Sequence, residues 1–130
     1  MTLRCTITLL TDRELLAALT GLALAGEQCL LEARENRRPF PLLYSAGVKY
    51  IEEPEGEEEW LLPREVMRFG GGDCEDLAAA WRVPELWLMG ELGARVYLRR
   101  VSSGLRHVMV RRANGVIEDP SVILGMPAPY

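Results

Sequence analysis

The stretch that decides the fold is Phe69-Gly70-Gly71-Gly72-Asp73-Cys74-Glu75-Asp76-Leu77-Ala78-Ala79-Ala80-Trp81. Its three glycines have no stable secondary structure of their own and allow positive φ angles and close backbone approach, so they predict a flexible loop. Asp73 follows the glycines and suits a helix N-cap, accepting a hydrogen bond from the amide of Asp76. The stretch therefore predicts a loop that leads into a helix, with Cys74 in the first helical turn.

The position of Cys74 favours thiol chemistry. Unpaired N–H groups and the positive end of the helix dipole collect at this end of a helix. They lower the pKa of a thiol and can donate to an oxyanion, although the two acidic residues that follow act in the opposite direction. Helical spacing predicts that Cys74 shares one buried face with Leu77, Ala78 and Trp81. Cys74 is therefore either a nucleophile on the floor of a cleft or a small buried hydrophobic residue.

Length and composition predict one globular domain, residues 1–130, that buries about two-thirds of its unfolded surface. A net charge of −4 argues against a general nucleic-acid binder. We find no apolar run of membrane-spanning length and no signal-peptide pattern at the start, so we expect no membrane partner. Three cysteines without metal-ligand spacing predict free thiols in a reducing, cytoplasmic-type compartment, with Cys5 and Cys29 as packing residues.

The chain before the glycines predicts one long helix and one irregular region. Residues 5–10 alternate and predict a short strand. Thr11 to Glu14 has the spacing of a capping box and starts a helix that continues to about Arg34. Residues 35–69 have no sustained period, apart from a short helix with Pro63 at its first position. So long an irregular region is unusual in a compact domain unless it builds a binding site.

The chain after Cys74 predicts a helix followed by an antiparallel meander. The helix is expected to run to about Gly90, with a kink at Pro84. Three strands are expected over residues 94–101, 105–112 and 116–119, joined by turns. This order of elements predicts an α+β fold.

The turn between the last two strands decides whether the only histidine meets an aspartate. His107 lies on the second strand of the meander and Asp119 ends the third. A two-residue turn at Asn114-Gly115, which local propensity favours, would put Asp119 on the face opposite to His107. A three-residue loop, Ala113-Asn114-Gly115, would instead place Asp119 across from Met109, diagonal to His107 on the same face. A catalytic site therefore requires the three-residue loop.

In that register Cys74, His107 and Asp119 supply a nucleophile, a base and an orienting carboxylate in chain order. The thiolate would attack an acyl carbon, His107 would protonate the leaving amine, and the Cys74 amide would stabilise the oxyanion. A second oxyanion donor is expected from the irregular region, where the Trp60 indole and the Tyr44 hydroxyl are the candidates. No metal site is expected, because a cysteine and an aspartate two positions apart on a helix diverge by about 200°.

Three segments of the chain carry a resemblance to a known family: Gly72–Ala78, Arg106–Val110 and Val116–Pro120. With them the chain resembles the transglutaminase-like branch of the papain-type cysteine enzymes, over roughly residues 69–121. The resemblance implies a papain/transglutaminase-like fold, in which the catalytic-cysteine helix packs on a small antiparallel sheet. It also implies a Cys-His-Asp triad at the positions given above. The chemistry implied is amide hydrolysis or acyl transfer through a thioester, with no metal or organic cofactor.

The chain also shows a second, smaller resemblance and two departures. Residues 43–50 resemble small proteins of this type encoded by tailed bacteriophages. Pro84 interrupts the core helix, and Val108 and Met109 stand where an aromatic residue often follows the family's histidine. The replacement at Val108 and Met109 affects residues that would contact the substrate.

Two functions from different classes follow. The first is a thiol-dependent amide-bond hydrolase or acyl transferase, a peptidase or amidotransferase acting on a protein or peptide substrate in a bacterial host cell. The alternative is a non-catalytic structural or assembly module of a phage virion, which would contact other virion proteins. An active thiol predicts that a limiting alkylating agent labels Cys74 before Cys5 and Cys29 at about pH 6–7.

Overall fold

The computed structural model describes residues 3–4, 11–52, 59–101 and 106–127 of the 130-residue chain. The helical elements are α1 (Asp12–Glu35), η1 (Leu43–Ser45), α2 (Pro63–Phe69), η2 (Glu75–Arg82), α3 (Val83–Leu88) and α4 (Pro120–Ile123). The strands are β1 (Leu3–Arg4), β2 (Lys49–Tyr50), β3 (Glu59–Trp60), β4 (Gly71–Gly72), β5 (Arg95–Arg100), β6 (Arg106–Arg111) and β7 (Ile117–Glu118). This mixture confirms the α+β class. The strand expected over residues 5–10 and the turn expected over 102–104 lie outside the described residues.

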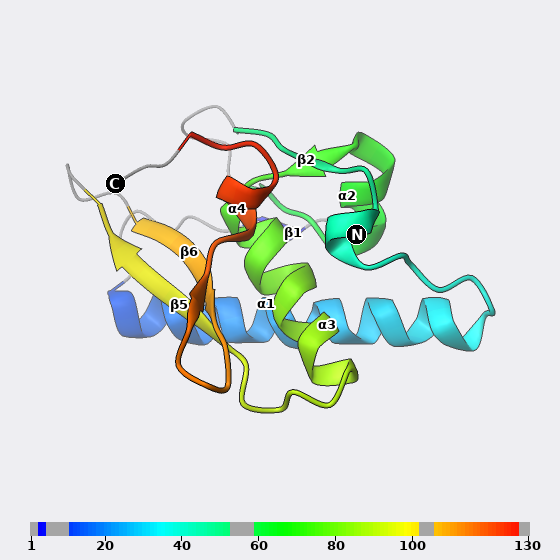
Figure 1. The fold of residues 1–130 in the computed structure, drawn as a ribbon, viewed down its shortest axis with the longest axis horizontal. Coiled ribbons are helices and arrows are strands. Elements are labelled where there is room, and N and C mark those ends of the chain that lie inside the picture. The colour runs from blue at the N-terminus through cyan, green and yellow to red at the C-terminus, as the bar shows by residue number, and fades with distance from the viewer. Residues whose placement is uncertain (1–2, 5–10, 53–58, 102–105, 128–130) are drawn as a thin grey trace.

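The long helix α1 begins where the capping box predicts. The Thr11 hydroxyl accepts a hydrogen bond from the Glu14 amide, and the Glu14 carboxylate accepts one from the Thr11 amide, both at 3.1 Å. Figure 1 shows α1 running along the length of the molecule. Its buried residues are Leu15, Leu19, Leu22, Ala23, Gly26, Cys29 and Leu30. The burial of Cys29 confirms it as a packing residue.

Contrary to our expectation from the sequence, α1 is long and apolar enough to cross a membrane by length and composition alone. Core helices of soluble proteins pass the same test. The buried side of α1 packs in a core cluster with residues of η2, α3, β5 and β6.

The helix after Cys74 is buried on every side, whereas the spacing predicts one buried face. Leu77, Ala78 and Trp81 each have 0% exposure. Leu77 and Trp81 pack in one apolar cluster, but Ala78 packs in the other, and Cys74 packs against that second cluster. The prediction of a single shared face is wrong because α1, α2, α4 and β6 all contact this helix.

The central helix has π geometry over η2 and α geometry over α3. The Val83 amide donates to the carbonyl of Ala78, five residues back, at the end of η2. A proline ring in an α-helix clashes with the carbonyl four residues before it, which is Ala80 for Pro84. We infer that the wider π turn accommodates this proline, so the helix continues to Leu88. The expected α-helix with a kink at Pro84 is corrected accordingly.

The glycines before Cys74 form an ordered strand, which corrects the expectation of a flexible loop. Gly70 ends α2 with φ +82°, and Gly71 and Gly72 form β4, paired in parallel with β2. A Cβ on Gly71 would lie 2.1 Å from the Lys49 carbonyl oxygen. One on Gly72 would lie 2.8 Å from the Cβ of Asp76. Close packing, and not mobility, therefore requires these glycines.

The meander forms a three-stranded antiparallel sheet in the order β5-β6-β7. Val110 opposes Glu118, and the Arg112 amide donates to the Val116 carbonyl at 2.8 Å. These pairs are those of the three-residue loop, in which Asp119 comes across from Met109. Gly115 takes φ +89° in this loop. The structure confirms the register that brings Asp119 to the His107 face.

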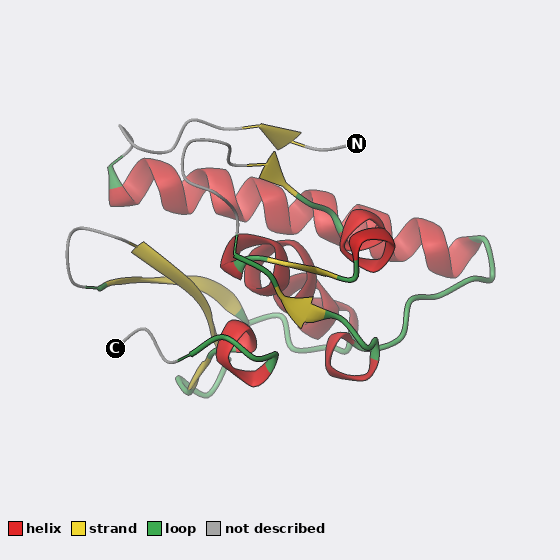
Figure 2. Cartoon of the chain, turned by 90° about the horizontal axis from the view of Figure 1, so that it is seen from above, coloured by secondary structure: helices red, strands yellow, loops and turns green. Residues whose placement is uncertain are grey.

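A short helix that the sequence did not predict follows the sheet. Pro120 follows β7 and starts α4. Seen from above in Figure 2, the long helix α1 lies on one side of the sheet and α4 on the other. This placement covers the His107 face of the sheet with the segment that Asp119 begins.

Candidate active site

His107 and Asp119 form a buried hydrogen-bonded pair. The Nε2 atom of His107 lies 2.9 Å from Oδ2 of Asp119, and His107 is 4% exposed. The other carboxylate oxygen, Oδ1, accepts from the Val122 amide at 3.3 Å and so caps α4. Two different elements therefore hold this carboxylate in one orientation. With Nε2 bound to Asp119, Nδ1 is the ring nitrogen that could exchange a proton with a thiol.

Cys74 lies beside the strand that carries His107. It is half-buried, and its sulfur accepts a hydrogen bond from the amide of Val108, the residue after His107. In the hydrogen-bond ladder between β6 and β7, the even-numbered residues of β6 point their amides toward β7, as the following residue Arg112 also does. The Val108 amide would pair with residue 120, but Pro120 starts α4. The sulfur of Cys74 binds this amide instead, so it lies beside the residue that follows His107 in the strand.

The pKa of the Cys74 thiol is raised well above its ordinary value, mainly by burial and then by the charges of Glu75 and Asp73. The hydrogen bond from Val108 acts in the opposite direction. The thiol donates to Oε2 of Glu75 at 3.5 Å. The structure therefore corrects the expectation of a lowered pKa, because burial and acidic neighbours outweigh the helix end.

Asp73 and Asp76 cap the helix and hold it to the preceding segment. Oδ1 of Asp73 accepts from the Asp76 amide at 3.4 Å, which confirms the predicted N-cap. The Asp76 carboxylate accepts from the amides of Asp73, at 3.1 Å, and Leu61, at 2.7 Å. Burial and the charge of Asp73 raise the pKa of Asp76 well above its ordinary value. These carboxylates fix the start of the cysteine helix.

The two predicted oxyanion donors have different surroundings. Trp60 is buried on β3, and its indole N–H has no hydrogen-bond partner among the described residues. Tyr44 lies on η1, and its hydroxyl donates to the Glu118 carboxylate. Burial and this carboxylate raise the pKa of Tyr44 above its ordinary value. The Tyr44 hydroxyl is thus bound to Glu118, while Trp60 packs in the core cluster against which Cys74 also packs.

The residue before Asp119 is the centre of a charged cluster that the sequence did not predict. Glu118 accepts from Arg82 Nε at 2.6 Å and from Arg112 at 2.8 Å. Arg82 also lies over the Tyr44 ring, 4.7 Å from its centroid, and pairs with Glu85 at 2.9 Å. This cluster joins β7 to η1 and η2, so it holds the strand that ends in Asp119. No local pattern signals it, because its members are far apart in sequence.

Tyr50 is a second residue that the sequence did not indicate. It pairs with Gly72 across β2 and β4, and its amide donates to the Leu124 carbonyl at 3.0 Å. Burial raises the pKa of the Tyr50 hydroxyl to about 12, and Cys74 in its ionised form and then Glu52 act in the same direction. Its phenol is therefore a neutral donor close to the thiol at neutral pH.

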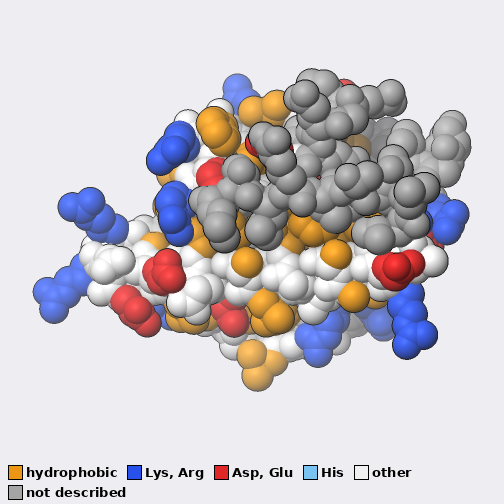
Figure 3. Space-filling model, turned by 180° about the vertical axis from the view of Figure 1, so that it is seen from behind, with side chains coloured by type: hydrophobic (Ala, Val, Ile, Leu, Met, Phe, Trp, Pro, Cys, Tyr) orange, Lys and Arg blue, Asp and Glu red, His pale blue; other side chains and the backbone are white. Residues whose placement is uncertain are grey.

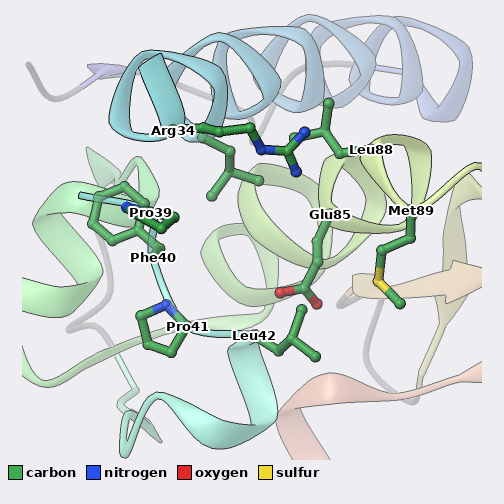
Figure 4. A pocket seen from close by; sticks show the side chains of 9 residues that line it. Arg34, Pro39, Phe40, Pro41, Leu42, Glu85, Leu88 and Met89 are labelled. Atoms are coloured by element: carbon green, nitrogen blue, oxygen red, sulfur yellow. The ribbon is translucent and has the colours of Figure 1, made fainter. Parts of the chain in front are cut away.

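Two hollows lie beside segments that contact the central helix. One, of about 220 Å³, is lined by the apolar side chains of Ile51, Leu61 and Phe69 beside the glycine strand β4. The other, of about 70 Å³, lies between α1, the 39–42 segment and α3 (Figure 4). The Glu85 carboxylate beside it accepts from the Leu43 amide and from Arg82. This second hollow is small and its carboxylate is already paired, so of these two hollows we take the first as the candidate substrate site.

Comparison of the chain with family models, curated proteins and solved structures found no match. The transglutaminase-like family therefore stays a prediction from the motifs.

Proposed function

We propose that the protein is a thiol-dependent amide hydrolase or acyl transferase with the papain/transglutaminase-like arrangement, in which Cys74, His107 and Asp119 act together. The observation that carries the proposal is the His107–Asp119 hydrogen bond of 2.9 Å on the strand whose next amide binds the Cys74 sulfur. A nucleophile, a base and an orienting group in these positions support acyl transfer.

The chemistry begins from a neutral thiol, because the pKa of Cys74 is raised. His107 accepts the thiol proton as the sulfur attacks the acyl carbon, and Asp119 stabilises the resulting imidazolium. His107 then gives the proton to the leaving amine, which leaves a thioester on Cys74. Water or a second amine attacks the thioester and releases the acid or the transferred amide. Hydrolysis and transfer differ only in this last acceptor.

The amide of Cys74 and one side chain supply the oxyanion site. Trp60 is the better of the two predicted donors, because its indole N–H is buried without a described partner, whereas the Tyr44 hydroxyl is bound to Glu118. The Tyr50 phenol is a third donor near the thiol. The hollow lined by Ile51, Leu61 and Phe69 suits an apolar side chain of an extended protein or peptide substrate.

The proposal is tested by profiling a peptide library with the full chain and with the Cys74→Ala variant. We expect amide products, or hydroxylamine-trapped acyl groups, that disappear in Cys74→Ala. The matched control is Cys29→Ala, which changes a thiol packed in the core and should keep the product pattern. Products that persist in Cys74→Ala, or no products at all, would contradict the proposal.

The second candidate is a non-catalytic structural or assembly module, for which a phage virion is the setting that the resemblance suggests. The raised pKa of Cys74 favours it, since an un-ionised thiol among carboxylates is a poor nucleophile at rest. If the protein is such a module, Cys74→Ala should change its assembly or its stability, and neither the wild type nor the variant should form amide or acyl products.

A further inference from the structure

We propose that the groove between α1 and the outer edge of β5 is a docking site for an extended acidic segment of a partner protein. The groove has a volume of about 580 Å³ and runs beside the N-terminal half of α1. It lies apart from Cys74, which binds the amide of Val108 on the β7 side of the sheet. The inference therefore stands independently of the proposed chemistry.

The first argument is the open backbone of β5. Odd-numbered residues of β6 point their backbone N–H and C=O groups toward β5. Because Met109 faces Tyr97, it is the odd-numbered residues of β5 that form hydrogen bonds with β6. Val96 and Leu98 then turn their N–H and C=O groups to the outer edge. No strand pairs with this edge in the part of the chain that the structure describes. An extended peptide can use such an edge as a template.

The second argument is charge. Among the described residues Arg13, Arg95 and Arg111 line the groove without an ion pair, and Arg95 donates only to the carbonyls of residues 92 and 94. The one carboxylate that lines the groove, Asp12, is neutralised by Arg106 at 2.7 Å and Arg100 at 3.1 Å. The groove is therefore positive on a chain of net charge −4, which favours an acidic occupant.

The third argument is the apolar lining between the arginines. Leu16 is 39% exposed and Tyr97 is 37% exposed at the groove. Figure 3 shows Lys and Arg side chains gathered beneath the N-terminal half of α1, with hydrophobic side chains among them. Side chains of an extended peptide alternate between two faces. A segment that alternates acidic and apolar residues matches both the arginines and the apolar lining.

The test uses a fluorescein-labelled octapeptide of alternating glutamate and valine, titrated with the full-length protein by fluorescence polarisation. We expect saturable binding that the double variant Arg13→Glu/Arg111→Glu weakens about tenfold or more. The control variant Arg68→Glu changes an exposed arginine of α2 and should bind like the wild type. Cys74→Ala should also bind unchanged. Amide exchange on the wild-type protein should show new protection at Val96 and Leu98 when the peptide is bound.

Three further probes test whether the groove binds another kind of ligand instead. A lysine–valine octapeptide and a glutamate–proline octapeptide should not bind, because the first has the wrong charge and the second cannot pair with an edge. Equal binding of either peptide, or no saturable binding of the first probe, would overturn the proposal. Stronger binding of a single-stranded oligonucleotide would replace it with a nucleic-acid site. Failure here would leave the Cys74-dependent products of the previous section unaffected.

Discussion

At the scale of single residues, the Cys74 sulfur has two neighbours with opposite effects on its pKa, the Val108 amide and the Glu75 carboxylate. The amide after His107 binds its sulfur, while Glu75 accepts its proton at 3.5 Å and is itself buried. A carboxylate so close disfavours the thiolate. Burial and Glu75 therefore keep the resting thiol neutral. In the proposed mechanism, the reaction then depends on transfer of the thiol proton to the imidazole of His107.

Glu75→Gln should increase the reactivity of Cys74. Removing the nearest negative charge lowers the pKa of the thiol, and each unit of pKa is worth about tenfold in thiolate at a pH below it. Site-resolved alkylation by limiting iodoacetamide at about pH 7 should be several-fold faster than in the wild type. Glu35→Gln, which changes an exposed residue at the end of α1, is the matched control. An unchanged rate in Glu75→Gln would remove Glu75 from this role.

At the scale of elements, the loop between β6 and β7 decides the site. Gly115 at φ +89° closes a three-residue loop, and this places Asp119 on the face of His107. A shift of one residue would move every side chain of β7 to the other face. The charged cluster around Glu118 holds the same strand from the other side.

Deleting Ile117 from β7 should separate the fold from the site. Arg112 would still face Val116, but Asp119 would then oppose Val110 and leave the His107 face. We expect a folded protein by circular dichroism in which any Cys74-dependent activity falls about a hundredfold or more, as expected for loss of general acid–base catalysis. Deleting Ala113 is the control, because Arg112 still faces Val116 across the remaining two-residue turn and the activity should be kept. Full activity in the Ile117 deletion variant would show that Asp119 does not orient His107.

The crossing of α1 and η2 gives an element-scale prediction about stability. A Cβ on Gly26 would lie 1.8 Å from the Ala80 carbonyl oxygen, so Gly26→Ala should destabilise the protein by about 1–3 kcal/mol or more. Gly21 is exposed on the same helix with nothing within 4 Å of its Cβ position, and Gly21→Ala should stabilise by about 0.5–1 kcal/mol. Urea unfolding measures both. A stable Gly26→Ala variant would contradict the close crossing.

Local patterns predicted the long helix and the helix starts, but long-range packing decided the rest. The capping box at Thr11 and the N-cap at Asp73 depend on neighbouring residues, so the sequence could indicate them. The three-residue loop was required by the catalytic hypothesis, against the local preference of Asn114-Gly115 for a two-residue turn. The ordered glycine strand and the π-helix depend on contacts with β2 and α1, which no local pattern records. For the same reason, the sequence did not reveal that Tyr44 binds Glu118.

At the scale of the whole molecule, ion pairs join parts that are distant in sequence. Arg112 binds Glu91 at 2.6 Å and Glu118 at 2.8 Å. Hydrogen bonds from Arg112 and the Ala113 amide lower the pKa of Glu91 from its ordinary value of 4.5 to about 2. Hydrogen bonds from Arg82 and Tyr44 lower the pKa of Glu118, against the effect of its burial.

The stability of the protein should fall as the pH is lowered from about 4.5 toward 2. A carboxylate whose pKa is lower in the folded state stabilises the fold above its unfolded pKa and loses this effect as the pH falls through its folded pKa. The raised pKa of Asp76 acts in the opposite direction. In Arg112→Gln the stability should fall less steeply between about pH 4.5 and 2 than in the control variant Arg13→Gln. Thermal unfolding across this pH range measures both. An equal slope in the two variants would count against this cluster as the source.

The central claim is that the thiol of Cys74 meets the imidazole of His107, braced by Asp119. The most direct measurement is the site-resolved rate of alkylation of Cys74 in the wild type and in His107→Gln, with Cys29 in the same chain as the internal control. The account predicts that His107→Gln slows labelling of Cys74 by about tenfold or more, because the base that takes its proton is gone, and leaves Cys29 unchanged. Equal rates at Cys74 in the two folded proteins would contradict it.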